Sequence, residues 1–320
     1  MRVAGIDCGT NSIRLLVADT RPGDDGAPRL ADVHREMRVV RLGQGVDATG
    51  MLAPEALERT FAAADDYAAT VRDLGAERVR FVATSAMRDA RNGDEFVAGI
   101  RARFGVEPEI VPGAEEAALS FAGAASVLPL AAGRPVLVVD LGGGSTEFVL
   151  GDAAGVRGAR SIDMGCVRLT ERHLRSDPPT AEEVAAAERD VDAGIDEALA
   201  GVPLGEATAV IGVAGSITTI TAHALGLPAY QPECIHGTEL PIAQVAAACT
   251  SLLGLTHAQR AELPYMHPGR VDVIGAGALV WRHILARLST LTDGRIATAV
   301  TSEHDILDGI ALSTLTKKTT

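Results

Sequence analysis

Residues 136–150 read Val-Leu-Val-Val-Asp-Leu-Gly-Gly-Gly-Ser-Thr-Glu-Phe-Val-Leu and predict a β-hairpin with a polar bend. A β-branched apolar run ends at Asp140, the glycines at 142–144 form a tight turn, and a second run of strand formers follows. Glycines lack Cβ atoms, so their N–H groups can converge on an anion, while Asp140 and Glu147 place two carboxylates beside the turn. Amide donors suit phosphate and carboxylates suit a metal ion, so the segment predicts a phosphoryl site.

The same plan occurs at residues 3–17, where an apolar strand, an aspartate, a small polar turn and a second apolar strand follow one another. A further pair of segments also matches, because residues 78–88 and 207–221 each predict a strand that opens into small polar residues and a helix. The halves correspond twice in the same order, which indicates a duplication. Duplicate halves with facing phosphate turns fit an α/β fold of the actin-like ATPase (ribonuclease H-like) type, with two lobes and an interdomain cleft.

The chain has 320 residues, enough for two domains that each bury a core. We expect an N-terminal actin-like lobe over 1–125 and a C-terminal one over 126–302, and the closing helix over 303–316 could pack back on the first. Turn residues and apolar periodicity predict further strands over 30–42, 107–111 and 295–301, and helices over 54–74, 180–199, 242–253, 256–263 and 271–288.

Composition limits the classes of partner. The formal charge of −13 argues against nucleic acid and anionic membranes, because either would require a basic face. The four cysteines show neither disulfide nor zinc spacing, which indicates a reduced, cytoplasmic protein, and no apolar run is long enough to span a bilayer. A negatively charged protein that binds a phosphate-rich anion needs a cation, so we expect strict dependence on a divalent metal ion.

Two more features of the first half predict chemistry. Thr84 and Ser85 follow a strand and precede Arg88, and this pattern fits an anion-binding turn and an ordinary helix N-cap about equally well. Glu115 and Glu116 lie in the first turn of a later predicted helix, where the helix dipole favours ionised carboxylates. Adjacent helical residues point about 100° apart, so only one of the two can orient or deprotonate a water in a cleft.

Together these motifs resemble the Ppx/GppA phosphatase family, the exopolyphosphatases and guanosine pentaphosphate phosphohydrolases of bacteria. Each motif is weak alone, but their joint occurrence in family order is specific. The sequence ends soon after the second predicted lobe, as in the short, two-domain actinobacterial exopolyphosphatases, so short chains are the expected substrate. The matching segments are 6–12, 85–88, 113–117, 139–147, 164–167 and 212–216.

The resemblance implies roles for individual residues. Glu116 would activate or align the attacking water, with Asp140 and Glu147 assisting catalysis. The metal ligands, for Mg²⁺ or Mn²⁺, would be Asp7, Asp140 and Glu147. A loose phosphoryl transition state needs an in-line water, a cation and amide donors more than a nucleophile, so elementary chemistry agrees. The implied phosphate-binding residues are Asn11, Ser12, Arg88, Gly142, Gly143, Gly144, Ser145, Gly215 and Ser216.

The implied activity is hydrolysis of the terminal phosphate of inorganic polyphosphate. The alternative is 5′-phosphohydrolysis of guanosine pentaphosphate (pppGpp), which the same residues would serve. A non-catalytic alarmone or polyphosphate sensor would require a broken water-activating residue, whereas Glu116 is intact; a sugar kinase or actin-like ATPase would share the two lobes. The resemblance also implies a cytoplasmic homodimer regulated by (p)ppGpp in the stringent response, with neither nucleic acid nor membrane as a partner.

Overall fold

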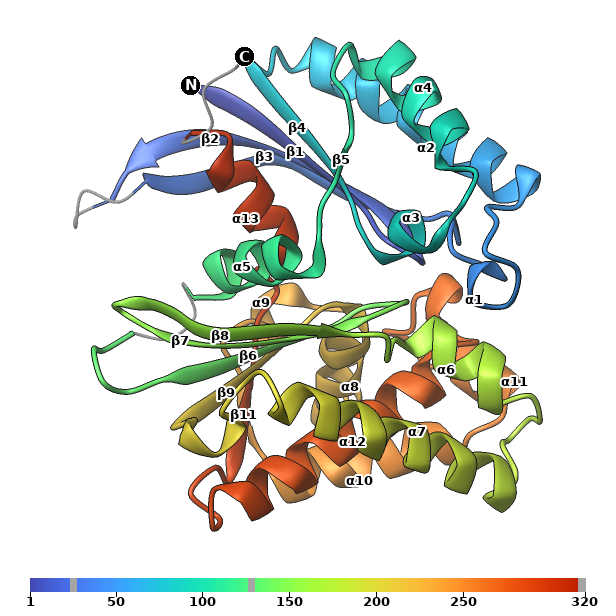
Figure 1. Ribbon diagram of the computed structural model, residues 1–320, viewed down its shortest axis with the longest axis vertical. Helices are drawn as coiled ribbons and strands as arrows, with labels where there is room; N and C mark the ends of the chain where they lie inside the picture. The colour runs from blue at the N-terminus through green and yellow to red at the C-terminus, as the bar shows by residue number, and fades with distance from the viewer. Residues whose placement is uncertain (24–27, 126–129, 316–320) are drawn as a thin grey trace. The chain divides into compact units, whose positions relative to one another are not determined.

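The computed structural model describes residues 1–23, 28–125 and 130–315. The chain divides into two compact units, one formed by Met1–Gly123 with Ile306–Thr320 and the other by Ala124–Asp305. Each unit contains one mixed β-sheet covered by helices (Figure 1). The predicted start of the second lobe at residue 126 and the predicted helix end at residue 316 lie outside the described residues.

The first unit has a five-stranded sheet in the order β3-β2-β1-β4-β5. The first three strands pair antiparallel, while β4 and β5 continue the sheet in parallel. Helices α2 and α4 pack on one face, and α5 and α13 lie on the other (Figure 1). The elements are β1 (Arg2–Cys8), β2 (Ser12–Pro22), β3 (Pro28–Val39), α1 (Val46–Thr49), α2 (Pro54–Asp73), β4 (Arg78–Ala83), α3 (Ser85–Asp89), α4 (Gly93–Phe104), β5 (Glu109–Ile110), α5 (Gly113–Ala124) and α13 (Ile306–Ser313).

Side-chain alternation along β1 determines which face carries chemistry. Ile6 and Cys8 enter the apolar core shared with α2 and α4, whereas Val3 packs in the cluster that includes residues of α13. Gly5 permits the close approach of α13, because a Cβ at this position would lie 3.0 Å from the backbone nitrogen of Ala311. By the same alternation, Asp7 faces the side of the sheet that α5 and α13 cover.

Two arginines tie α13 to the sheet of the first unit. Arg35 forms an ion pair with the buried Asp308, with 2.6 Å between Nη2 and Oδ1. Arg80 donates from Nη1 to the Ser313 hydroxyl at 2.7 Å. The helix begins at Ile306, later than predicted, because Ser302 precedes it in a turn in which its hydroxyl accepts the backbone N–H of residue 304.

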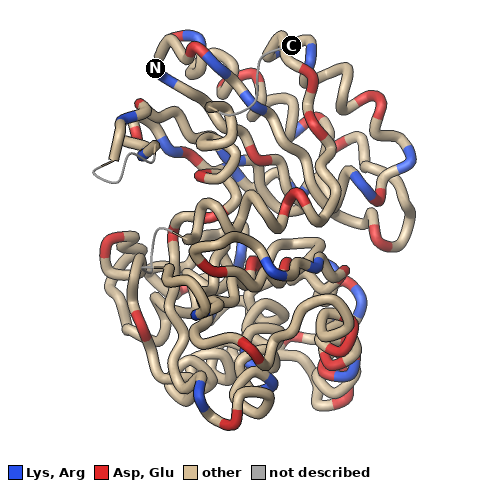
Figure 2. Tube along the Cα trace, turned by 60° about the vertical axis from the view of Figure 1, so that its left-hand side comes forward, with Lys and Arg blue, Asp and Glu red and all other residues tan. Residues whose placement is uncertain are grey.

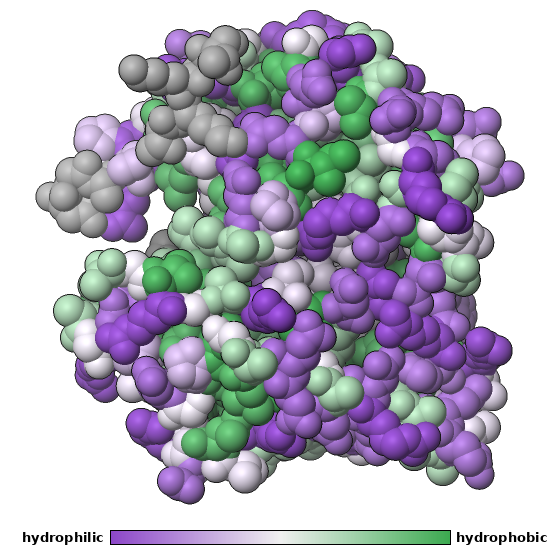
Figure 3. Space-filling view, in the orientation of Figure 1, coloured by the Kyte–Doolittle hydropathy of each residue, from purple (hydrophilic) through white to green (hydrophobic). Residues whose placement is uncertain are grey.

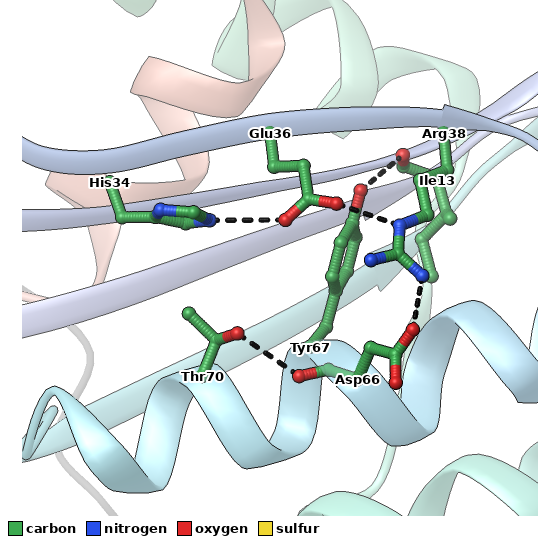
Figure 4. A network of polar contacts seen from close by, with 7 residues as sticks. All are labelled: Ile13, His34, Glu36, Arg38, Asp66, Tyr67 and Thr70. Carbon is green, nitrogen blue, oxygen red and sulfur yellow. Dashed lines mark hydrogen bonds and ion pairs between the residues drawn. The ribbon is translucent and has the colours of Figure 1, made fainter.

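Charged side chains and a buried tyrosine fix the edge strand β3 and helix α2 to the sheet (Figure 4). Arg38 on β3 donates to Glu36 at 2.7 Å and also pairs with Asp66 on α2. Its guanidinium lies 5.4 Å from the ring centroid of Tyr67, whose hydroxyl donates to the carbonyl of Ile13 at 3.2 Å. Charges on an edge strand also oppose pairing with the strand of another chain.

The second unit has a six-stranded sheet in the order β10-β11-β9-β6-β7-β8. Its strands β8-β7-β6-β9-β11 repeat the order β3-β2-β1-β4-β5, with antiparallel and parallel pairs at the same places. This repetition confirms the predicted duplicated α/β topology. The strands are β6 (Val136–Leu141), β7 (Thr146–Asp152), β8 (Gly155–Ile162), β9 (Ala209–Val213), β10 (Glu239–Pro241) and β11 (Thr298–Thr301).

The helices of the second unit bury one large core around Trp281 and the inward side chains of the sheet. A capping box of Thr180 and Glu183 starts α7 where the sequence predicts it. The last long helix starts three residues later than predicted, because a 3₁₀ turn at Pro268–Arg270 precedes it. The helices are α6 (Cys166–His173), α7 (Ala181–Leu199), α8 (Gly215–Leu225), α9 (Pro232–Ile235), α10 (Ile242–Gly254), α11 (His257–Ala261) and α12 (Ile274–Leu291).

The molecular surface is polar and carries charges of both signs. Ion pairs connect α7 to α12, among them Glu188 with Arg282 at 2.9 Å and Asp196 with Arg287, and the side of the second unit that includes α7 is largely hydrophilic in Figure 3. Figure 2 shows basic and acidic residues interspersed along both units. None of the described helices combines the length and apolarity that crossing a membrane would require.

Candidate active site

Both predicted hairpins form, and their bends have the same hydrogen bonding. The N–H of Gly9 donates to the carbonyl of Ser12 at 2.9 Å, and the N–H of Gly142 donates to the carbonyl of Ser145 at 3.0 Å. Each bend joins an inner strand to its antiparallel neighbour, β1 to β2 in the first unit and β6 to β7 in the second. The two units therefore carry the same turn at the same place in the sheet.

In the second unit, Asp140 and Glu147 lie directly opposite each other on β6 and β7. Both are buried, with 5% and 1% of their surfaces exposed, and Ser161 donates to Oε1 of Glu147 at 2.6 Å. Directly opposed residues have Cβ atoms about 4.5–5.5 Å apart, so two carboxylates at these positions repel each other when both are ionised, and a cation would relieve that repulsion.

The donor chemistry of this pair fits Mg²⁺ or Mn²⁺. Within the described residues, no group of three or more His, Cys, Asp and Glu side chains could hold a metal ion. Mg²⁺ does not need such a group, because it usually binds one or two protein carboxylates and completes its shell with water and substrate phosphate oxygens. Asp140 and Glu147 would supply two such carboxylates.

The equivalent pair in the first unit has one charge reversed. Asp7 lies opposite Arg14, whose Nε and Nη2 atoms both donate to Oδ2 of Asp7, at 2.8 and 2.6 Å. Asp7 is buried, and the guanidinium neutralises its charge locally. Asp7 was predicted as a metal ligand from the sequence, whereas Arg14 was not predicted as part of the site. Counting the hairpin register outward from the bend would have placed Arg14 opposite Asp7.

Helix α6 holds the glycine bend from one side. The N–H groups of Cys166 and Val167 donate to the carbonyls of Gly142 and Gly143, at 3.0 and 2.8 Å, and Nε of the buried Arg168 donates to the carbonyl of Gly144 at 2.8 Å. The C=O and N–H of a planar trans peptide point in opposite directions. The N–H groups of Gly143, Gly144 and Ser145, which follow these carbonyls, are therefore turned away from α6.

Gly165 is required for this packing, because a Cβ there would lie 2.2 Å from the carbonyl oxygen of Gly143. The sequence analysis does not identify Arg168 or Gly165 as parts of the site. The sequence offers only an indirect indication of them, because Gly165 lies within the family motif at residues 164–167 and Arg168 directly follows it. The turn between β8 and α6 thus supports the glycine bend.

The turn from β9 into α8 contains a strained residue. Ala214 has a φ of 72° and a ψ of 169°, a region that essentially only glycine occupies. The next residue, Gly215, lies against the guanidinium of Arg270, because a Cβ on Gly215 would be 2.3 Å from Nη2. Arg270 also donates to the Thr219 hydroxyl at 3.1 Å, and Ser216 is buried in the first turn of α8. Arg270 therefore belongs to this turn.

Replacing Ala214 with glycine is expected to stabilise the protein by about 1 kcal/mol. The strain removed is of order 1–3 kcal/mol, and the greater freedom of glycine in the unfolded chain offsets about 0.4–1 kcal/mol of it. Urea unfolding should show a higher midpoint at an unchanged slope. The same substitution at the exposed Ala193, inside α7, should destabilise the protein by about 1 kcal/mol. A lower free energy of unfolding in both variants would contradict backbone strain at Ala214.

Glu116 is a buried carboxylate of the first unit that pairs with Arg88. It is 7% exposed on α5, and Nη1 of Arg88 lies 2.6 Å from its Oε2. Burial raises the pKa of Glu116, against the charge and hydrogen bond of Arg88 and a hydrogen bond from Thr84, which act in the opposite direction. The helix dipole was expected to keep this carboxylate ionised, but desolvation is the larger effect on its pKa. A base with a raised pKa is better suited to accept a proton from water.

The neighbouring carboxylate points elsewhere. Oε1 of Glu115 lies 2.6 Å from Nη2 of Arg80, and the Glu115 side chain is 38% exposed. Only one member of the pair is therefore buried beside Arg88. Thr84 precedes α3 but makes no side-chain cap, because its hydroxyl bonds to Glu116 instead. The sequence analysis left open whether this turn caps the helix, and the structure assigns the Thr84 hydroxyl to the carboxylate.

Replacing Arg88 with alanine is expected to shift the acidic limb of the pH–rate profile to higher pH. Arg88 lowers the pKa of Glu116, so its removal lets burial raise that pKa further. A higher pH is then needed before Glu116 is ionised and can accept a proton. KM should also rise if Arg88 binds phosphate. Arg88→Lys retains the charge and should shift the limb less. An unchanged acidic limb in Arg88→Ala would contradict the coupling.

The structure thus places the predicted residues in two sets. The first unit holds Glu116 with Arg88, and Asp7 with Arg14, and the carbonyl of Asn11 accepts the N–H groups of residues 40 and 41. The second unit holds the carboxylate pair, the glycine bend and the start of α8. The predicted members by unit are Asp7, Asn11, Ser12, Arg88 and Glu116 in the first, and Asp140, Gly142, Gly143, Gly144, Ser145, Glu147, Gly215 and Ser216 in the second.

Comparison with known proteins gives matches over nearly the whole chain. Exopolyphosphatase 2 of Mycobacterium tuberculosis is 52% identical over 317 residues, which cover 98% of both chains. A crystal structure of an exopolyphosphatase-like protein superposes with a TM-score of 0.91 at 47% identity and covers 98% of each chain. The guanosine-5′-triphosphate,3′-diphosphate pyrophosphatase of Vibrio cholerae is 35% identical over 56% of this chain and 34% of its own length. The Ppx/GppA phosphatase family profile matches residues 16–314. As its motifs predicted, the chain belongs to the Ppx/GppA phosphatase family.

Proposed function

We propose that this protein is an exopolyphosphatase that hydrolyses the terminal phosphate of inorganic polyphosphate, with short chains as its expected substrate. The observation that carries the proposal is the buried Glu116–Arg88 pair, present in a chain that is 52% identical along its length to a protein named Exopolyphosphatase 2.

Each set has a separate task. Glu116, with its pKa raised by burial, aligns the attacking water and accepts its proton, while Arg88 holds the carboxylate in place. The amides of Gly143, Gly144 and Ser145 bind phosphate oxygens on the side away from α6. Asp140 and Glu147 would hold Mg²⁺ or Mn²⁺, which neutralises charge on the transferred phosphoryl group.

The alternative is removal of the 5′ γ-phosphate of pppGpp, which the same groups would serve. The relatives named for guanosine pentaphosphate match a smaller part of this chain, which favours polyphosphate. The preference for polyphosphate over pppGpp is tested by measuring phosphate release with and without Mg²⁺ or Mn²⁺. The substrates are tripolyphosphate, longer polyphosphates of defined length and pppGpp. A higher kcat/KM for pppGpp would reverse this preference.

Two other outcomes, the second from an added assay with ATP and a sugar, would support the remaining alternatives. Absence of phosphate release from every substrate in Mn²⁺ would support a non-catalytic sensor, and ATP turnover that requires a sugar acceptor would support a kinase. A cytoplasmic homodimer and regulation by (p)ppGpp are further parts of the proposal. Light scattering tests the dimer, and inhibition of phosphate release by ppGpp tests the regulation.

A further inference from the structure

A cavity of about 200 Å³ lies within the second unit, at the opposite end of α6 from the glycine bend. It is bordered by the C-terminal part of α6, the segment after it, α11 and the first turn of α12. None of its residues belongs to the predicted site. Its lining consists of Thr170, Leu174, Arg175, Ser176, Asp177, Pro179, His257, Arg260, Asp272, Gly275 and Ala276.

Arg260 is a buried cation at this cavity. Only 5% of its surface is exposed, and its Nε and Nη1 atoms donate to the carbonyls of Leu252 and Val271, at 3.2 and 3.3 Å. Among the described residues, carboxylates act on it only from beyond ion-pair distance, and burial lowers its pKa. The direct hydrogen-bond partners of Arg260 are carbonyls, while Asp177 and Asp272 act from a distance, so an anion in the cavity would add a compensating charge at close range.

The N-terminus of α12 adds to the positive potential. Gly275 and Ala276 line the cavity within the first turn of this 18-residue helix, whose first N–H groups have no partner inside the helix. A Cβ on Gly275 would point at the guanidinium, 3.4 Å from Nη2 of Arg260. The absence of a side chain therefore leaves open the space between the helix N-terminus and the arginine, where an oxyanion could receive hydrogen bonds from both.

Two aspartates also line the cavity, and His257 holds both of them. Its backbone N–H donates to Oδ1 of Asp177 at 2.7 Å, and its Nε2 lies 2.9 Å from Oδ1 of Asp272. These contacts direct the bonded carboxylate oxygens to His257. Arg175 adds a further cationic donor at the wall, whereas the hydroxyls of Thr170 and Ser176 donate to Cys166 and Glu183.

We propose that this cavity binds a small phosphate-class oxyanion between Arg260 and the N-terminus of α12, at a second site separate from the phosphate bends. The inference does not depend on the proposed enzymatic function. The bound anion would contact two helices that also support the candidate active site. The first turn of α6 holds the glycine bend, and Gly277 of α12 packs so closely on Ser216 that a Cβ there would lie 2.6 Å from its hydroxyl oxygen.

Titration calorimetry of the full chain with inorganic phosphate tests the site. Gly275→Ala adds a methyl group against the guanidinium without disturbing the helix, since alanine is the better helix former. We expect this variant to bind one phosphate fewer than the parent protein, with the other binding unchanged. Gly254→Ala, where a Cβ would meet open space at the end of α10, is the matched control and should bind as the parent does.

Arg260→Gln provides a second variant, and its folding is checked by its unfolding midpoint. Loss of the same binding event in a folded Arg260→Gln protein would support the assignment. Equal stoichiometry in the parent and Gly275→Ala proteins would overturn it. This readout is independent of phosphate release from polyphosphate, so failure of the second site and failure of the proposed activity would be distinguishable.

Discussion

Replacing Glu116 with glutamine is expected to lower kcat on polyphosphate by roughly 10²–10⁴-fold, the usual contribution of a positioned general base. The amide keeps the shape of the side chain and can still bond to Thr84, but it cannot accept a proton from water. KM should change little, because Glu116 contacts the water and not the phosphates in the proposed arrangement. Initial rates on tripolyphosphate at saturating Mg²⁺ measure both constants.

Glu115→Gln is the matched control for this variant. Glu115 adjoins Glu116 on α5 but is paired with Arg80 and partly exposed, so its loss should change kcat by less than a few-fold. Equal losses in both variants would mean that the charge at the start of α5 matters, and not the buried carboxylate. Full activity of Glu116→Gln would assign proton acceptance to another residue.

The fold was largely predictable from the sequence because it is duplicated. Each half offers two independent patterns, so the match of residues 3–17 to 136–150 supports the match of 78–88 to 207–221, and the strand order of both sheets confirms the duplication. Helix α4 and most of strand β8 were not predicted, and other errors are at element ends. The helix predicted from residue 303 starts at Ile306, and the one predicted from residue 271 starts at Ile274, because hydrogen-bonded turns that periodicity does not reveal precede both.

The site was less predictable, because its supporting contacts join segments distant in sequence. Arg168 reaches the carbonyl of Gly144, Thr84 reaches Glu116, and Arg270 lies on Gly215, and no local pattern indicates any of these pairs. The pKa of Glu116 illustrates the limit. The helix dipole is visible in the sequence, but burial is not, and burial sets the direction of the shift.

Replacing Glu147 with glutamine is expected to lower kcat by roughly a thousandfold, since a catalytic cation supplies several kcal/mol of transition-state stabilisation. It should also leave a signature that needs no substrate. Glu147 and Asp140 repel each other while both are ionised, so removing one charge should raise the unfolding temperature of the metal-free protein. Thermal unfolding with and without Mg²⁺ measures this effect.

The metal-dependent change in unfolding temperature is the decisive quantity. A ligand at a hundred times its dissociation constant stabilises the native state by about 2.7 kcal/mol, so the parent protein should gain stability in Mg²⁺ while Glu147→Gln and Asp140→Asn gain much less. Glu182→Gln, an exposed carboxylate on α7, should keep the full gain. The Mg²⁺-dependent gain of Asp7→Asn shows whether Asp7, which is already paired with Arg14, is also a metal ligand. An undiminished Mg²⁺ effect in both Glu147→Gln and Asp140→Asn would remove the cation from the cross-strand pair and require another role for these two buried carboxylates.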